Sequence, residues 1–398
     1  MGPVVAIVCE YNPLHRGHAR QLDLVRRDFG QDAAIVCVMS GNFVQRGEPA
    51  VYEKSVRARA AVACGASLVL ELPLTAALSS AEGFADGAVA VADGLGCVDA
   101  LCFGSEHGET DALVETAKRL LDPNLDGLLR RALDRGLSYA AARTAALEEL
   151  GGRAELLRRP NDILAIEYCK AMVKRGSPMT PHAVHRPGGY HDTAPHPDHP
   201  SATALRGLLA AGEDITPYVP EAAAALFRAA VLHDMAHGER AVLARLRGME
   251  YDEFRTVPYG SEGLWSKLAR TCKTESTVAG ILNGVKSKRY AYSRIQRMVL
   301  CAYLGLTAEE LQRPAPYARV LAFDDRGRQI LSMARKTGTL PLCNAGSTPP
   351  DRDYYKMECR AADLYSLFAA SEIAPVGSED RGRIWYEKRL AKSQEKFA

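Results

Sequence analysis

Short apolar runs alternate with helical patterns through the first two hundred residues, and this alternation constrains the fold more than any other feature of the chain. Each run has the length of one buried strand and is bounded by turn residues. The predicted strands are residues 4–9, 33–39, 68–72, 98–103 and 180–185. The predicted helices between them are residues 17–29, 53–64, 80–93 and 110–121. Such alternation predicts an α/β fold built on a Rossmann-like, doubly wound parallel sheet with helices on both faces.

The pattern changes near residue 212, beyond which it is mostly helical with short polar loops. Residues 125–176 are also helical in pattern, and a loop rich in Gly, Pro and His covers residues 187–200. At roughly 150 residues per domain, a chain of 398 residues holds two or three domains. We expect a Rossmann-like domain over residues 1–212 and a mainly α-helical domain over residues 213–398.

Composition excludes several classes of protein. Hydrophobic residues at 47% and charged residues at 25% are typical of globular proteins and exclude a disordered or coiled-coil chain. Fifty Lys and Arg against 48 Asp and Glu leave a charge of +2, so any preference for a partner depends on where charge is placed. No apolar run approaches the roughly 18 residues of a membrane span. The ten cysteines form no Cys-x-x-Cys pair, and we expect reduced thiols in a cytoplasmic protein.

The strongest chemical signal is His15-x-Gly17-His18, directly after the first predicted strand and at the start of its helix. Ligands of doubly wound sheets bind at the carboxyl ends of the strands. A helix N-terminus there offers backbone N–H groups to a phosphate, and two imidazoles one turn apart can donate hydrogen bonds to it. Gly17 allows a base or ribose to approach the backbone. The alternative is that both histidines only cap the helix or face solvent.

A second feature supports phosphate binding. Ser201, Thr203 and Arg206 open a helix after the last predicted strand, where hydroxyls and one positive charge suit a polyphosphate. Alone this hexapeptide is weak, because Ser and Thr are ordinary helix caps. Together the two motifs predict an ATP site in which the α-phosphate is attacked and pyrophosphate leaves.

Both motifs resemble those of the nucleotidylyltransferase superfamily. Longer sequence motifs make the resemblance specific to one family of that superfamily. They lie at residues 10–13, 40–47, 71–73, 103–106, 160–164, 288–290 and 293–297. With them the chain resembles the bacterial tRNA(Met) cytidine acetate ligase family from Val4 to about Leu367. The resemblance implies that ATP and free acetate form acetyl-adenylate and pyrophosphate. The acetyl group then passes to N4 of the wobble cytidine of elongator tRNA(Met), giving N4-acetylcytidine.

Carried over by position, the resemblance implies a set of ATP-binding residues. They are Val8, Cys9, Glu10, Tyr11, Asn12, Pro13, Leu14, Arg16, Gly17, Ala19, Arg20, Gln21, Gly104, Asn161 and Arg186, joined by Ser201, Thr203 and Arg206. Leu14 and Arg16 depart from the Phe and Asn common in the family, and Arg16 is the change with scope to alter nucleotide affinity. His15 and His18 would be catalytic, stabilising charge on the α-phosphate. Arg186 or Arg206, with Mg²⁺, would neutralise the pyrophosphate. The sequence does not identify the acetate pocket.

Residues 255–297 carry nine Lys or Arg against Glu262 and Glu275, a local charge of +7. Such a segment suits an RNA backbone, and its tyrosines could stack on an unpaired base. The alternative is that these positive charges only form a solvated helix face and bind no RNA. The predicted tRNA-binding residues are Lys286, Lys288, Arg289, Tyr290, Arg294 and Arg297.

Two histidine groups raise the question of zinc. Residues 182, 185, 191, 196 and 199 lie in or near a Pro-rich loop without Cys, and His233 and His237 are four residues apart on a predicted helix. Neither has the ligand set of a zinc site, so we expect no metal site. We expect no membrane association and no stable protein partner. Two other functions remain open, an adenylyltransferase acting on a small phosphorylated metabolite and a non-catalytic RNA-binding module.

Overall fold

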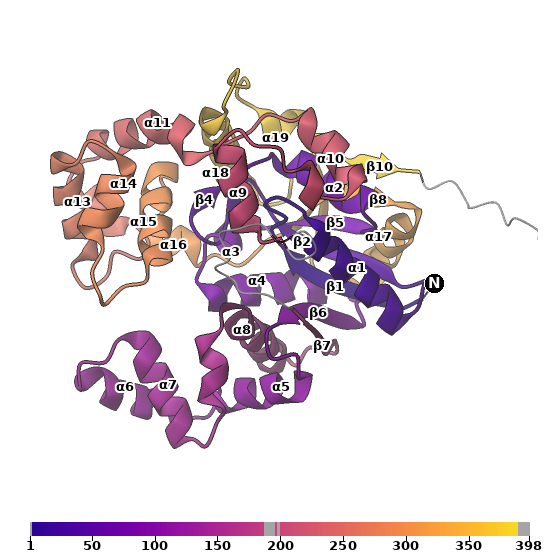
Figure 1. Cartoon of the computed structure of the whole chain (residues 1–398), viewed down its shortest axis with the longest axis horizontal. Helices are drawn as coiled ribbons and strands as arrows, with labels where there is room; N and C mark the ends of the chain where they lie inside the picture. Colours follow the sequence, from indigo (N-terminus) through magenta and orange to yellow (C-terminus); the bar gives the residue numbers. More distant parts are fainter. Residues whose placement is uncertain (1, 187–195, 197–199, 389–398) are drawn as a thin grey trace, which may run out of the picture.

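The computed structural model describes residues 2–186, 196 and 200–388, and an eight-stranded sheet forms its centre (Figure 1). Five strands come from the first half of the chain: β1 (Val4–Cys9), β2 (Ala34–Ser40), β5 (Leu68–Leu72), β6 (Ala100–Ser105) and β7 (Thr180–His185). They pair in parallel in the order β5-β2-β1-β6-β7. The chain moves outward from β1 in one direction and then in the other, so the topological switch lies between β1 and β6, as predicted for a doubly wound sheet.

Three further strands of this sheet come from the second half of the chain. Strand β8 (Ala318–Asp324) lies antiparallel to β5, and β9 (Leu342–Asn344) and β10 (Trp385–Glu387) pair in parallel with β8. The sequence pattern did not indicate these strands. Strands β9 and β10 are only three residues long, and the seven-residue β8 lies in a part of the chain whose pattern was interpreted as mostly helical. The sheet therefore continues past the boundary predicted near residue 212, and the two-domain division stays a prediction.

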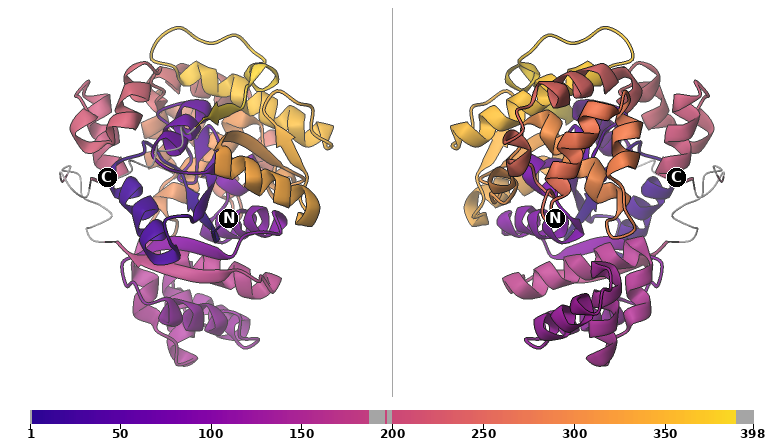
Figure 2. Two further views of the ribbon diagram at one scale, coloured as in Figure 1. Left: turned by 90° about the vertical axis from the view of Figure 1, so that its right-hand side faces the viewer. Right: turned by 90° about the vertical axis from the view of Figure 1, so that its left-hand side faces the viewer.

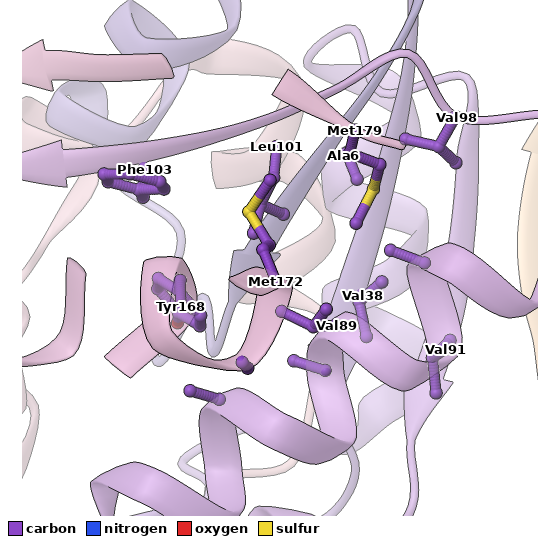
Figure 3. Packing of buried hydrophobic residues seen from close by; sticks show 14 of the residues in the cluster. Ala6, Val38, Val89, Val91, Val98, Leu101, Phe103, Tyr168, Met172 and Met179 are labelled. Carbon is purple, nitrogen blue, oxygen red and sulfur yellow. The ribbon is translucent and has the colours of Figure 1, made fainter. Parts of the chain in front are cut away.

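Successive side chains of the strands point to opposite faces, which separates two cores. One face packs against α4 (Ala81–Gly94), α5 (Thr110–Arg119), α8 (Pro160–Arg175) and α17 (Asp325–Thr337). Figure 3 shows this core close by, with Phe103 of β6 near Tyr168 of α8 and Leu101 near Met172. The other face packs against α1 (Arg16–Phe29), α2 (Lys54–Ala63) and α10 (Glu221–Arg228).

A third core lies within the helical lobe, which we define as residues 235–311. Its main helices are α11 (Met235–Gly248), α13 (Leu264–Thr274), α14 (Val278–Val285) and α15 (Tyr292–Leu304), and α18 (Arg352–Tyr365) completes the core. The shorter elements of the lobe are α12 (Glu253–Thr256) and α16 (Ala308–Leu311). Phe43 of the small hairpin of β3 (Phe43–Val44) and β4 (Glu48–Pro49) inserts into this core, which ties the lobe to the sheet domain.

The remaining elements frame these cores. They are α3 (Leu74–Ala77), α6 (Leu125–Asp134), α7 (Tyr139–Glu149), α9 (Ala202–Ala210), α19 (Ser378–Arg381) and three 3₁₀ turns at Ala154–Arg158, Thr216–Tyr218 and Ser366–Phe368. Figure 2 shows helices α5–α8 at one end of the molecule and α18 and α19 at the opposite end. Within the described ranges, no helix combines the length and apolar character needed to cross a bilayer.

Candidate active site

A cavity of about 270 Å³ opens at the carboxyl ends of β1, β6 and β7, where the topology predicts a ligand; we call it the first cavity. Most of the sequence-predicted ATP residues line it: Val8, Cys9, Glu10, Tyr11, Asn12, His15, Gly17, His18, Arg20, Gln21, Gly104, Asn161, Arg186, Ser201, Thr203 and Arg206. Pro13, Leu14, Arg16 and Ala19 are not among its lining residues. Leu14 is fully buried in the core and Arg16 points to solvent, so the two departures from the family pattern lie outside the cavity wall.

The two motif histidines form one stacked pair at the start of α1. Their ring centroids lie 3.7 Å apart with an interplanar angle of 21°, and the edge of Tyr11 packs against His18 at 5.0 Å. The backbone N–H of His15 donates to Nδ1 of His18 over 3.3 Å. Because that nitrogen accepts, the proton of neutral His18 lies on Nε2, and His18 is a hydrogen-bond donor through Nε2.

Both histidines are neutral at physiological pH. Burial and the nearby Arg186 guanidinium lower the pKa of His15 to about 3. Burial, His15 and Arg186 also lower the pKa of His18 well below its usual value. The rings therefore act as dipolar donors, and the positive charge of the cavity comes from arginine.

Three buried polar atoms of the cavity wall are left unsatisfied. Within the part of the chain that the structure describes, Nδ1 and Nε2 of His15 and Nδ2 of Asn12 have no hydrogen-bond partner. Buried polar atoms are nearly always paired in native proteins, and unpaired ones at a cavity wall indicate a place for a polar ligand.

Gly17 lines the cavity, and the structure adds a second reason for a glycine at this position. A Cβ at this position would come within 3.0 Å of Cε1 and 3.1 Å of Nδ1 of His15. A ring cannot swing away as a flexible chain end can. Gly17 therefore leaves room for the His15 ring.

Arg206 is fixed at the mouth of the cavity by two hydrogen bonds. Its Nη1 donates to the backbone oxygen of Asn12 over 3.0 Å, and its Nη2 donates to Oγ1 of Thr203 over 3.2 Å. Ser201 caps α9 by accepting from the N–H of Ala204 at 3.0 Å. The predicted motif thus carries one held cation and a helix N-terminus at a single wall.

Arg186, which also lines the cavity, is held in a chain of polar contacts. Its Nη1 donates to Oδ1 of Asn161 over 3.1 Å, and Nδ2 of Asn161 donates to Glu106 over 2.7 Å. Glu106 also accepts from the N–H of Asp162 at 2.9 Å, so it caps α8. Arg186 follows β7 and Asn161 lies on α8, so the two elements together hold the Arg186 guanidinium at the cavity.

Glu10 forms the floor beside the histidines. Its carboxylate accepts from the N–H of Gln45 at 2.8 Å, and burial raises its pKa. Arg57 lies behind this floor and donates to the backbone oxygens of Glu10, Ser40 and Gly41. These bonds fix the loops that follow β1 and β2 against each other.

Sequence reasoning assigned no role to several lining residues. Gln45 and Arg46 belong to a string used only for family resemblance, whereas Phe84 of α4 and Tyr168 of α8 gave no signal. The spacing of an aromatic residue on an apolar helix face predicts only a position in the core. Both do pack in the core, and each also shows part of its ring to the cavity.

The predicted tRNA-binding residues lie around the turn between α14 and α15, which we call the basic segment (residues 286–297). Lys286, Lys288 and Arg289 are exposed. Arg289 pairs with Glu262 at 2.6 Å, and the hydroxyl of Tyr290 donates to the same carboxylate at 3.0 Å. The segment thus presents cations to solvent on an ordered turn.

Arg294 and Arg297 differ from their exposed neighbours. Arg294 donates to the backbone oxygen of Tyr259 over 3.1 Å and to Ser261 over 2.8 Å. Arg297 is buried and donates to the backbone oxygen of Gln45 over 3.0 Å. Its contact is with the loop that lines the first cavity, which leaves it little surface for an RNA phosphate.

Three of the other histidines have separate partners, and His185 lines the first cavity. His182 contacts Asp28 at 3.0 Å, the His233 ring stacks on Tyr365 at 4.2 Å, and His237 contacts Asp234 at 2.7 Å. His191 and His199 lie outside the described residues. No group of three or more metal-ligating side chains occurs in residues 2–186, 196 and 200–388.

Comparisons with known proteins agree with this geometry. Residues 2–379 match the family described as HIGH Nucleotidyl Transferase. The tRNA(Met) cytidine acetate ligase of Geobacillus sp. (strain WCH70) is 34% identical over 91% of this chain and 94% of its own length. That of Acetivibrio thermocellus is 32% identical over 92% and 94%.

Two crystal structures of Thermotoga maritima TmcAL are similar to the whole fold. The apo form superposes with a TM-score of 0.90 at 29% identity, over 97% of this chain and 100% of that one. The form bound with alpha-thio ATP gives a TM-score of 0.87 over the same shares.

Proposed function

This chain belongs to the HIGH nucleotidyl transferase family, and we propose that it is an ATP-dependent ligase that acetylates N4 of the wobble cytidine of elongator tRNA(Met). The substrates are ATP, acetate and a cytoplasmic tRNA. The observation that carries the proposal is the first cavity, where unpaired His15 and Asn12 atoms face a space flanked by Arg186 and Arg206. The similar TmcAL structure is bound with alpha-thio ATP, which supports ATP as a substrate of this chain.

In the first step, an acetate oxygen attacks the α-phosphorus of ATP and the bond to the β-phosphate bridging oxygen breaks. Acetyl-adenylate forms and pyrophosphate leaves with the electron pair. The α-phosphate gains charge during the attack, and Nε2–H of His18 with the His15 ring are placed to donate to it. A neutral imidazole carries one N–H, so each ring can donate one hydrogen bond to the phosphate.

The leaving pyrophosphate requires positive charge. Arg186 and Arg206 are each held by hydrogen bonds to the protein, so little side-chain entropy is lost when they bind an anion. The N-terminus of α9 lies beside Arg206 and adds backbone donors.

In the second step, N4 of the cytosine attacks the acetyl carbonyl carbon. The bond from that carbon to the phosphate oxygen breaks, AMP leaves, and N4 loses one proton. The exposed cations of the basic segment support binding of the tRNA backbone during this transfer.

Mg²⁺ fits the first cavity as a companion of ATP. Among the described lining residues, Glu10 alone carries a carboxylate, which matches the preference of Mg²⁺ for phosphate oxygens with few protein ligands. Glu10 would hold the ion, which would supply charge neutralisation for the triphosphate.

The test incubates the purified protein with ATP, labelled acetate and total tRNA, followed by digestion of the RNA to nucleosides. We expect labelled N4-acetylcytidine, formed with one pyrophosphate per acetyl group. Pyrophosphate release that needs a phosphate ester and not acetate would indicate an adenylyltransferase of small metabolites instead. Absence of any ATP turnover would indicate an RNA-binding module.

A further inference from the structure

One part of the first cavity is apolar, and no step of the proposed reaction uses it so far. Its side chains are Phe84 of α4, Phe103 of β6, and Leu164 and Tyr168 of α8, and we call these four residues the apolar wall. Phe84, Phe103 and Tyr168 are almost fully buried. The wall is thus an edge of the core on the α4–α8 face of the sheet, open to the cavity. Sites for small molecules combine such a surface with a few placed polar groups.

The Tyr168 hydroxyl is the polar group of this wall. The Tyr168 ring is fixed in the core, with its centroid 5.7 Å from that of Phe103 and an interplanar angle of 34°, and Figure 3 shows both rings. No other residue that the structure describes forms a hydrogen bond with the Tyr168 hydroxyl. Because buried polar groups are nearly always paired, this hydroxyl indicates a place for a polar atom of a ligand.

The hydroxyl lies toward the floor of the cavity. Burial, together with nearby Glu10 and Cys9 at the end of β1, raises the pKa of Tyr168 well above its usual value. The hydroxyl therefore keeps its proton and is a hydrogen-bond donor. Glu10 is also the floor residue beside His15 and His18, so a ligand held by Tyr168 lies next to the place of the α-phosphate.

The charge of the floor suits an anion. Burial raises the pKa of Glu10, whereas the N–H of Gln45 and the guanidiniums of Arg206, Arg57 and Arg46 act in the opposite direction. Three guanidiniums near one carboxylate leave an excess of positive charge. A second carboxylate at this floor is therefore attracted by the site as a whole.

The apolar wall and Arg206 stand on opposite faces of the sheet. The wall belongs to the core on the α4–α8 face, whereas Leu205, the neighbour of Arg206 on α9, packs in the core on the α1 face. In phosphoryl transfer the attacking and leaving oxygens lie roughly in line across phosphorus. With pyrophosphate at Arg206, a nucleophile at the apolar wall would approach the α-phosphate from the other side.

From these contacts we infer that the apolar wall is the acetate subsite, where the methyl group packs against Phe84, Phe103 and Leu164 and the Tyr168 hydroxyl donates to one carboxylate oxygen. The other carboxylate oxygen is left to attack phosphorus, with the bond changes of the first step and with the Tyr168 proton retained. The inference rests on the proposed function and adds the pocket of the smaller substrate. A longer carboxylate would place its extra carbons against the Phe84 ring, so the wall also limits the length of the acid.

The first test removes only the hydroxyl. Tyr168→Phe keeps the ring in the core, and exchange of labelled pyrophosphate into ATP is measured against acetate and ATP concentration. We expect the KM for acetate to rise by about tenfold or more, the scale of one lost hydrogen bond to a charged group, with the KM for ATP within about twofold. The control is Tyr303→Phe in the helical lobe, which loses a hydroxyl bonded to the backbone oxygen of Leu364 at 2.9 Å and should keep both KM values.

The other outcomes of this test are equally specific. An unchanged KM for acetate in Tyr168→Phe would overturn the inference. A rise in the KM for ATP alone would also overturn it and would indicate the adenine at the wall, and a loss confined to transfer to tRNA would indicate the cytosine there instead. A wild type with no acetate-dependent exchange would overturn the proposed function itself.

A second measurement does not depend on how much of the variant folds. In Phe84→Leu the side chain is smaller by roughly one methylene group, and kcat/KM for propionate is compared with that for acetate in the same preparation, so the folded fraction cancels. We expect this ratio to rise by about tenfold over the wild type. Phe227→Leu, a buried phenylalanine of the core on the α1 face, should keep the wild-type ratio. Equal ratios in Phe84→Leu and the wild type would contradict the acetate subsite.

Discussion

The first cavity and the basic segment present positive charge in opposite ways. In the first cavity, Arg186 and Arg206 are fixed by neighbours, and the buried ring of His15 has no hydrogen-bond partner among the described residues. In the basic segment, Lys288 and Arg289 are exposed to water. Preorganised, desolvated donors stabilise a transition state strongly, whereas exposed cations supply affinity that salt screens. Damage to the cavity should therefore reduce the chemical step, and damage to the segment should reduce RNA binding.

The largest effect should come from His18. In His18→Ala the Nε2–H donor is lost, and acetate-dependent pyrophosphate release should fall by about a hundredfold to a thousandfold. The tRNA affinity should stay within about twofold, because the basic segment is unchanged. Steady-state release assays and filter binding measure the two quantities. A variant with the wild-type release rate would remove the histidines from the mechanism.

A smaller loss is expected from Gly17→Ala. The added Cβ would press on the His15 ring at 3.0 Å, so we expect activation of acetate to slow by about tenfold with tRNA binding intact. Gly207→Ala is the control, because its Cβ meets no atom within 4 Å. If Gly17→Ala is as active as the control, the position of the His15 ring does not limit the reaction.

A change in the basic segment should have the opposite pattern, with RNA binding reduced and the chemical step unchanged. Reversing Lys288 and Arg289 to Glu should weaken tRNA binding by about tenfold at low salt and reduce its salt dependence, with adenylate formation unchanged. The control reverses Arg335 and Lys336, an exposed pair at the end of α17 on the opposite side of the molecule in Figure 1. Equal binding by the two double variants would retire the segment as the RNA surface.

The smallest effect concerns stability and pH. The pKa of His15 is about 3 in the folded protein and near 6.5 when unfolded, so the unfolded chain binds more protons between these values. The free energy of unfolding should fall as the pH drops from about 6.5, by about 1 kcal/mol per pH unit from this residue. Urea unfolding at pH 7, 6 and 5 should show a shallower fall in His15→Gln. Parallel curves for the two proteins would contradict the assignment of a neutral, buried His15.

Much of the fold could be predicted, because burial on both faces gives parallel strands a continuous apolar signal. The five predicted strands correspond to β1, β2, β5, β6 and β7, with ends that differ by at most two residues. The helices α1, α2, α4 and α5 were also located. Strands β9 and β10 could not be found, because three residues carry too short a pattern.

The candidate site was predictable where a motif is local. His15, Gly17 and His18 act within one helical turn, and Ser201, Thr203 and Arg206 within another. Their roles at atomic level were not predictable. That Gly17 makes room for a ring, and that Arg297 turns inward to Gln45, depend on contacts between residues distant in sequence.

From the amino-acid order alone one can predict the parallel sheet, the histidine motif at its edge and the positive charge of residues 255–297, because periodicity, helix-end chemistry and net charge are local properties. Long-range packing brings Arg186 and Arg206 to one cavity, and it adds C-terminal strands to the sheet. A cavity is the space left by side chains from distant segments, and no local pattern encodes where that space remains.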